Sequence, residues 1–226
     1  MMDNPVVVDF PLRGEWNAPN TPGTRIPSHG TDMLGQRYAY DFIGVAPGGS
    51  SLKFYRMSPL RYLLFGARLA DCYGWGQPIY AAADGTVAQA GDGWPERNPV
   101  HLARDLFMLF KNGLSIRSTE GLDLRILTGN YVIVESSAGY MLYAHAQNGS
   151  VRVAPGEKVT TGQHLANVGH SGNSTAPHLH FHIMDQLDPW KAQGIACCFR
   201  EYEVWQNGGW QPVRNGIPTA AERIRR

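Results

Sequence analysis

The stretch Pro177-His178-Leu179-His180-Phe181-His182 carries the strongest signal for both the fold and the chemistry of this chain. Alternate residues of a β-strand point to opposite faces of a sheet, so the three histidines share one face and Leu179 and Phe181 share the other. A loop that contains Ser171-Gly172-Asn173-Ser174 comes just before this stretch. The pattern predicts a strand that packs against the core on one side and presents three imidazoles on the other.

Similar strand-like segments surround the histidine stretch, and turn signals such as Asn148-Gly149 and Pro155-Gly156 separate them. Short strands at this spacing are typical of a sandwich or a small barrel. We therefore predict a mainly β domain, an antiparallel β-sandwich or partly open barrel. The predicted strands in this half cover residues 124–127, 131–135, 140–144, 150–153, 164–168 and 178–184.

The first half of the chain predicts further strands together with two helices. In the segment 38–43, Asp41 falls on the same face as Ala39 and Ile43, where an ionised carboxylate is costly unless it is paired or binds a metal. His29 lies in a long loop, rich in Pro and Gly, that leads into this strand. The remaining predictions are a strand at 6–10, a loop at 11–30, helices at 58–71 and 101–111, a hairpin at 78–87 and a hairpin of 201–205 with 210–213.

The charge and the apolar content of the 226 residues argue against a nucleic-acid partner and against a membrane span. Lys and Arg number 20 and Asp and Glu number 19, and this near-neutral balance offers no field that would attract nucleic acid. No apolar run approaches the roughly 18 residues that a membrane span needs. The N-terminal residues have neither a basic region nor a long apolar region, so no secretory signal is visible and the localisation is left open.

A catalytic zinc ion takes three protein ligands from His, Asp or Glu and keeps a fourth position for water. Beside the histidine stretch, the best candidates by residue type are Asp41 and His29. His145 follows the predicted strand 140–144, and a strand end can deliver its side chain into the same cleft. The sequence therefore supplies enough ligands and spare imidazoles for a catalytic metal site.

Several segments, taken together and in this order, resemble the core of the lysostaphin/LytM-type zinc metalloendopeptidases, which cleave peptide bonds in bacterial peptidoglycan. The resemblance covers about half of the chain. It implies the fold of that family in a single domain over residues 1–226, with insertions at about 42–76 and 91–128 and a C-terminal extension at 185–226. The segments that carry it are 78–87, 131–135, Tyr143-Ala144-His145, 153–163 and 169–181.

The resemblance implies that Asp41 and His180 are ligands of one zinc ion, and that His145 and His178 are the catalytic histidines of the cleft. The family usually has a ligand histidine four residues before the aspartate, but Arg37 occupies that position here. An arginine does not give up its proton to bind a metal. We therefore assign the third ligand to His29. His101 and Asp32 are the alternatives.

The predicted function is hydrolysis of peptide bonds, most simply in peptidoglycan cross-links or stem peptides, by a zinc-activated water. His178 would take the proton of the water and His145 would donate a hydrogen bond to the oxyanion, although spacing alone leaves these two roles interchangeable. Such a substrate would place the enzyme outside the cytoplasm, secreted or periplasmic. The oligomeric state is left open.

Two other interpretations compete with this one. The first is a metal-depleted, non-catalytic LytM-like module that binds a partner or a cell-wall glycan. The second is a biotinyl or lipoyl carrier, because residues 153–163 also resemble the turn of such domains, but no lysine stands at a predicted hairpin tip. Of the other histidines, we expect His182 to be exposed at the end of its strand, and His164 and His170 to lie in loops or at the surface.

Overall fold

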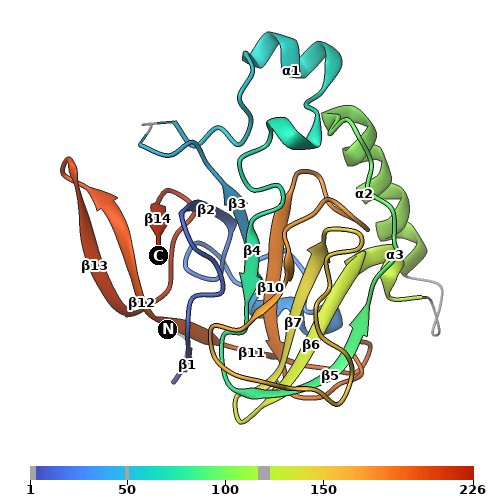
Figure 1. The fold of residues 1–226 in the computed structure, drawn as a ribbon, viewed down its shortest axis with the longest axis vertical. Helices are drawn as coiled ribbons and strands as arrows, with labels where there is room; N and C mark the ends of the chain where they lie inside the picture. Colours follow the sequence, from blue (N-terminus) through green and yellow to red (C-terminus); the bar gives the residue numbers. More distant parts are fainter. Residues whose placement is uncertain (1–3, 49–50, 117–122) are drawn as a thin grey trace.

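The computed structural model describes residues 4–48, 51–116 and 123–226, and its dominant feature is one large β-sheet (Figure 1). The helices lie outside the sheet. They are η1 (Met33–Tyr38), α1 (Pro59–Phe65), η2 (Leu69–Asp71), α2 (Leu102–Ile116) and α3 (Arg125–Thr128). The strands are β1 (Val6–Val8), β2 (Glu15–Asn20), β3 (Tyr40–Gly44), β4 (Pro78–Tyr80), β5 (Gly85–Gly91), β6 (Asn130–Ser136), β7 (Gly139–Ala146), β8 (Lys158–Val159), β9 (His164–Asn167), β10 (His178–Met184), β11 (Gly194–Ile195), β12 (Cys197–Gln206), β13 (Gly209–Gly216) and β14 (Arg223–Arg225).

The large sheet follows the order β1-β12-β14-β2-β3-β10-β7-β6-β5-β8, while β11 pairs with β10 and β13 pairs with β12. All of its pairs are antiparallel except β1 with β12. β4 and β9 form a separate two-stranded sheet. The predicted mainly β fold is confirmed. The strand order has two ends, β1 and β8, so the described part of the sheet does not close into a barrel.

β10 lies between β3 and β7, and its two faces differ as predicted. Leu179, Phe181 and Ile183 are fully buried in the main hydrophobic core, which also contains Tyr40 and Phe42 of β3. Burial of such side chains contributes roughly 1.5–3 kcal/mol each to the stability of the sheet. This packing fixes which face of β10 carries the histidines, because a shift of one residue would turn them into the core.

Several predicted elements are wrong. The loop 11–30 contains β2, and residues 150–153 form no strand. β4 and β5 are not a hairpin, since β4 pairs with β9 and β5 pairs with β6 and β8. Asp84-Gly85 has the composition of a hairpin turn, which is why a hairpin was predicted at 78–87, but Asp84 instead accepts hydrogen bonds from Thr161. The Asp-Gly signal therefore marks a contact between two loops.

One predicted strand and one predicted helix also need correction. Residues 124–127 were expected to be a strand, but α3 forms there, and the Asp123 carboxylate accepts the backbone N–H of Arg125 at 3.0 Å. An aspartate in this position stabilises a helix start, and a short apolar run fits either structure. α2 continues beyond Asn112-Gly113, because one glycine in a helix costs only about 1 kcal/mol.

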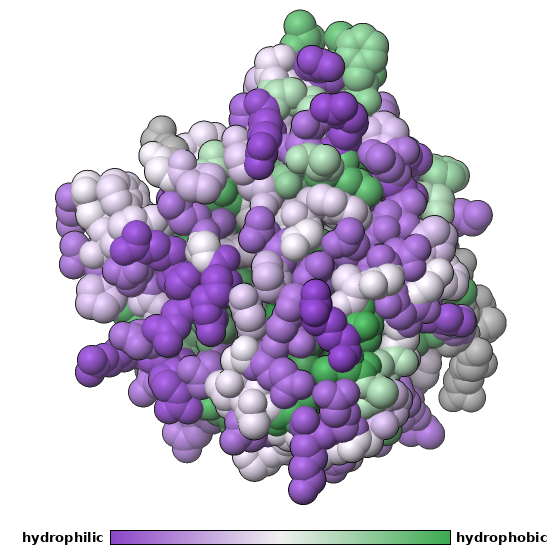
Figure 2. All heavy atoms as spheres, in the orientation of Figure 1, coloured by the Kyte–Doolittle hydropathy of each residue, from purple (hydrophilic) through white to green (hydrophobic). Residues whose placement is uncertain are grey.

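The helix predicted at 58–71 is shorter in the structure. Ser58 caps α1 by accepting the N–H of Arg61, and the helix ends at Gly66, whose φ of +70° few other residues adopt. Apolar side chains gather at the end of the molecule where α1 projects (Figure 2). Leu60, Leu63, Leu64 and Phe65 are all exposed there. None of the described helices is both long and apolar enough to cross a membrane.

Candidate metal centre

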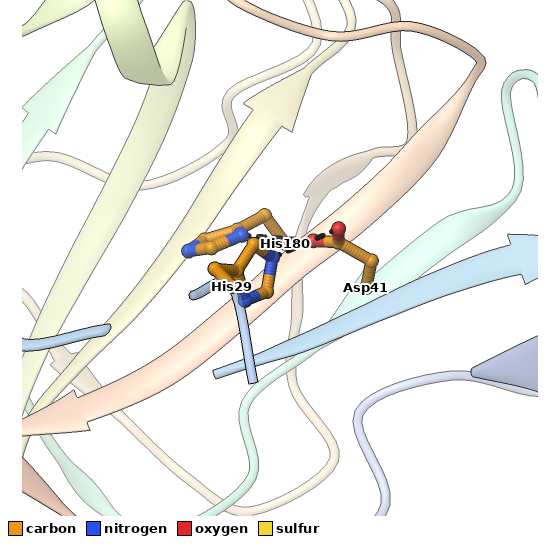
Figure 3. Close-up of side chains that lie close together, drawn as sticks. All are labelled: His29, Asp41 and His180. Carbon is orange, nitrogen blue, oxygen red and sulfur yellow. Dashed lines mark hydrogen bonds and ion pairs between the residues drawn. The ribbon is translucent and has the colours of Figure 1, made fainter. Parts of the chain in front are cut away.

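Three potential metal ligands point toward one another on the histidine face of β10 (Figure 3). His29 Nε2 lies 2.9 Å from Asp41 Oδ2, and His180 Nδ1 lies 2.8 Å from Asp41 Oδ1. One donor atom from each of the three residues lies within 4.8 Å of the other two. The structure therefore brings together the three residues that the sequence analysis selected as ligands.

The backbone explains why these residues meet. His180 of β10 is directly opposite Asp41 of β3 in the antiparallel register, and opposite residues project from the same face of a sheet. His29 lies in a turn that is fastened by two backbone hydrogen bonds, Ser28 N–H to Arg37 O and Gly30 N–H to Pro27 O. Two ligands are thus set by sheet register and the third by a tied turn.

Asp41 is only 8% exposed, and both of its oxygens have partners. Oδ2 also accepts a hydrogen bond from Asn20 Nδ2 at 2.8 Å, and Oδ1 lies 3.4 Å from His178 Nε2. Burial by itself raises the pKa of this carboxyl. The charges of His29 and His178 and hydrogen bonds from the histidines outweigh burial, so the pKa lies well below its usual value. The carboxylate is therefore ionised and ready to hold a cation.

The second ring nitrogen of each candidate ligand is also bonded. His29 Nδ1 lies 3.0 Å from Ser28 Oγ, and His180 Nε2 lies 3.0 Å from His182 Nδ1. With a cation bound between them, the protons would sit on these outer nitrogens, and His29 Nε2 and His180 Nδ1 would each offer a lone pair to the cation. Ligand histidines in metalloproteins usually hold their other N–H in such a bond. Two oriented imidazoles and one carboxylate fit zinc.

His182 was expected to be exposed at the end of its strand, but in the structure it is only 2% exposed. The segment η1 packs on β10 and covers this end of the strand.

Replacing His182 with leucine should remove the hydrogen-bond acceptor for His180 Nε2 and lower metal affinity about tenfold. Competition with a chelating dye measures this affinity. His164→Leu on β9 is the control, and equal affinities for both variants would contradict the assignment.

His145 and His178 lie beside the three ligands, with ring centroids 4.6 Å apart. His145 Nδ1 is 2.9 Å from the carbonyl oxygen of Ser171, and His178 Nδ1 is 2.7 Å from that of Ala176. A carbonyl oxygen only accepts, so Nδ1 of each ring carries the proton. In its neutral form, each ring therefore leaves its Nε2 as a proton acceptor.

The surroundings of these two histidines shift their pKa values in opposite directions. Burial lowers the pKa of His145 well below its usual value. Burial also lowers the pKa of His178, but the nearby Asp41 carboxylate outweighs it, and the net shift is upward. His145 also has a φ of +61°, a conformation that costs about 1 kcal/mol or more in residues other than glycine. Neighbouring groups whose pKa values shift in opposite directions are typical of catalytic sites. Residues with a strained backbone are also enriched there.

All five residues line one cavity of about 370 Å³. Leu124, Leu127 and Thr128, in and just before α3, form another part of its wall. The sequence analysis missed this wall because it placed a strand there. Asn20 was not predicted to contribute either, because residues 11–30 were expected to form a loop and the strand β2 that carries Asn20 was not anticipated.

The alternative ligands do not reach this cavity. Asp32 forms an exposed ion pair with Arg37 at 2.7 Å, so the residue at the usual histidine position serves a surface contact. His101 lies at the start of α2, where its backbone N–H donates to Asp105. His170, expected in a loop or at the surface, lies in a loop and is fully buried. Of the three candidates for the third ligand, His29 is the one with a ligand atom next to Asp41 and His180.

Residues 113–192 match the family model of Peptidase family M23. This range is about a third of the chain and contains His145, His178 and His180, whereas His29 and Asp41 precede it. The resemblance to lysostaphin/LytM-type peptidases is thereby confirmed. The M23 match supports a peptidase and hence a peptide substrate.

Solved structures give further similarities. The catalytic domain of lysostaphin from Staphylococcus simulans is 18% identical, with 80% of this chain and 88% of that chain covered and a TM-score of 0.39. A variant catalytic domain of the prophage-encoded M23 protein EnpA from Enterococcus faecalis is 22% identical. The match covers 54% of this chain and 67% of that chain, with a TM-score of 0.35. A zinc containing peptidase from Vibrio cholerae is 18% identical, with 85% of this chain but only 38% of that chain covered and a TM-score of 0.35.

Proposed function

We propose that this protein is a zinc metalloendopeptidase that hydrolyses peptide bonds in peptidoglycan, in its cross-links or stem peptides. His29, Asp41 and His180 would hold one zinc ion per chain. The observation that carries the proposal is the convergence of His29 and His180 on the buried Asp41, beside two further histidines in the same cavity. The M23 match supports the reaction class.

A zinc ion at this point would polarise the scissile carbonyl and lower the pKa of a bound water to about 7. His178 would take the proton from the attacking water at Nε2 and return it to the leaving amine. The Asp41 carboxylate, 3.4 Å from that nitrogen, stabilises the protonated ring. The bond from Nδ1 to Ala176 O keeps Nε2 turned to the cavity.

His145 has a different part in this proposal from the one first expected. A hydrogen bond from Nε2 to an oxyanion would require a protonated ring, because Nδ1–H is already held by Ser171 O. The low pKa of His145 keeps the ring neutral. We therefore propose that Nε2 of His145 accepts a hydrogen bond from the attacking water and orients it toward the carbonyl carbon.

The wider organisation is also a proposal. We propose one peptidase domain over residues 1–226 whose insertions, at about 42–76 and 91–128, border the active-site cavity and shape the substrate. The leucines Leu124 and Leu127 in the cavity wall support this idea for the second insertion. Peptidoglycan as the substrate would require the protein to act outside the cytoplasm, secreted or periplasmic.

His29 provides the sharpest test, because it departs from the usual spacing of the family. Purified protein is expected to hold about one zinc per chain and to lose peptidoglycan hydrolysis after chelation. His29→Ala should lose most of this metal, because one of three protein ligands is removed. Elemental analysis after gel filtration measures the metal, and release of soluble fragments from purified peptidoglycan measures hydrolysis.

His101→Ala and Asp32→Asn are the matched controls, and both should retain the metal. Metal loss in one of them but not in His29→Ala would assign the third ligand elsewhere. A folded protein without metal and without hydrolysis would favour the non-catalytic binding module. Hydrolysis that continues unchanged after complete chelation would refute the metallopeptidase.

A further inference from the structure

A chain of buried polar side chains leads from α2, in the second insertion, to the proposed catalytic residue His178. Asp105 of α2 is 1% exposed, and its Oδ2 lies 3.4 Å from His170 Nε2. His170 Nδ1 is 3.0 Å from Ser174 Oγ, and Ser174 Oγ is 3.1 Å from His178 Nδ1. The chain thus ends on the ring nitrogen opposite the one that faces Asp41.

Ser174 fixes more than the ring of His178. Its hydroxyl donates to the carbonyl of Ala176 at 2.6 Å, and the same carbonyl accepts the N–H of His178 Nδ1. One side chain therefore links the backbone of the loop and the imidazole that follows it. A displacement of this loop would rotate the ring of His178 and move its Nε2 away from the cavity.

Arg97 fastens this loop to the insertion. Its guanidinium donates to the carbonyl oxygens of Gly172 and Ser174, at 2.6 Å each, and to Asp105 Oδ1 at 3.0 Å. One planar cation thus spans two points of the loop while the buried carboxylate holds it in place. Arg104 donates to the same carboxylate at 3.0 Å.

The burial of Asp105 needs these partners. Burial raises the pKa of a carboxyl, but the contact with His170 and hydrogen bonds from Arg104, Arg97 and the backbone N–H of His101 outweigh it, and the pKa of Asp105 lies below its usual value. A buried carboxylate is costly to keep and adds little net stability even when well paired. The contacts made here instead give the loop before His178 one defined conformation.

We propose that Asp105 and Arg97 are positioning residues that hold the loop 172–176 and, through Ser174, the ring of His178. This inference rests on the proposed function for the catalytic part of His178. It assigns the second insertion a role in catalysis that does not require contact between Asp105 or Arg97 and the substrate. The metal ligands His29, Asp41 and His180 are not part of this network.

Asp105→Asn tests the proposal directly. The variant keeps the shape of the side chain and removes the charge that holds Arg97, so kcat should fall about tenfold. Metal content should stay at the wild-type value, because the three candidate ligands lie outside the network. Asp71→Asn is the control, since it breaks a comparable pair with Arg68 at the surface. It should leave kcat unchanged.

Two further comparisons separate positioning from simple stability. In a double-mutant cycle, Asp105→Asn and Ser174→Ala should be non-additive in kcat, because both act on His178 along one path. Arg97→Lys should retain more activity than Arg97→Met, and this pair carries the test if Asp105→Asn does not fold. Additive effects on kcat, or equal activity of the two Arg97 variants, would overturn the proposal.

A measurement independent of activity distinguishes failure of this inference from failure of the proposed function. In NMR spectra of protein labelled with 15N-histidine, wild-type His178 should give one tautomer, protonated at Nδ1. Asp105→Asn should give a mixture of tautomers or a broadened signal, whereas Asp71→Asn should not. An unchanged His178 signal in Asp105→Asn refutes the positioning network even if the protein hydrolyses peptidoglycan. A changed signal supports the network even if no hydrolysis is found.

Discussion

His180→Ala is expected to abolish both metal binding and peptide hydrolysis. His180 supplies one of the three proposed ligand atoms, and its Nδ1 lies 2.8 Å from Asp41. Without it, two protein ligands remain, and the retained zinc should fall from about one per chain to near zero. The rate of peptidoglycan hydrolysis should fall by at least about a thousandfold, which corresponds to ~4 kcal/mol of lost transition-state stabilisation.

Elemental analysis and a fragment-release assay on the same preparation check both parts of this result. His164→Ala is the matched control, because its ring lies on β9 and bonds to Ala166 O and Asn167 rather than to the candidate site. Thermal unfolding of both variants shows whether the fold survives. A folded His180→Ala protein that keeps one zinc would remove His180 from the ligand set.

His178→Ala is expected to keep the metal and lose turnover, which separates the two histidines of one strand. Loss of a general acid and base lowers kcat by about 10²- to 10⁴-fold. The zinc content should stay near one per chain, because Nδ1 of His178 is bonded to Ala176 O and Nε2 only approaches Asp41. KM should change little, since truncation of the ring enlarges the cavity without removing its apolar wall.

Steady-state kinetics on a defined peptidoglycan peptide, with metal analysis alongside, check this result. Added imidazole should restore part of the activity of His178→Ala by entering the space that the ring vacates. Loss of zinc in the folded variant would instead make His178 a ligand. Near-normal kcat would show that His178 is not the proton carrier, and the same measurement on His145→Ala would then test the other imidazole.

Local pattern was sufficient for the strand that carries the site. The alternation of Leu179 and Phe181 with the histidines has a period of two, and a strand between two others can satisfy it in only one orientation. The pattern therefore predicted β10 with its correct bounds and faces. It also placed Asp41 on the face of β3 opposite to Tyr40 and Phe42, which the core confirms.

Patterns with no period were less informative. The short apolar run at 124–127 fits a strand or a helical turn, and the Asp123 carboxylate, which accepts the backbone N–H of Arg125, favours the helix. Asp84-Gly85 is typical of a hairpin turn, but the pairing of β4 with β9 separates the two strands. The conformation depends on a specific hydrogen bond in the first case and on pairing with a distant strand in the second. The local composition reveals neither of these contacts.

The sequence by itself determined the mainly β fold, the histidine face of β10 and the residue types of a metal site, because these follow from alternation along one strand and from ligand chemistry. Tertiary structure alone decided that His29 reaches Asp41, that η1 buries His182, and that Asp105 lies behind His170. These contacts join residues 12 or more positions apart, or elements that pack only after the sheet has formed. These contacts depend on the register of β3 with β10 and on the burial of side chains beneath neighbouring segments. A local sequence pattern encodes neither.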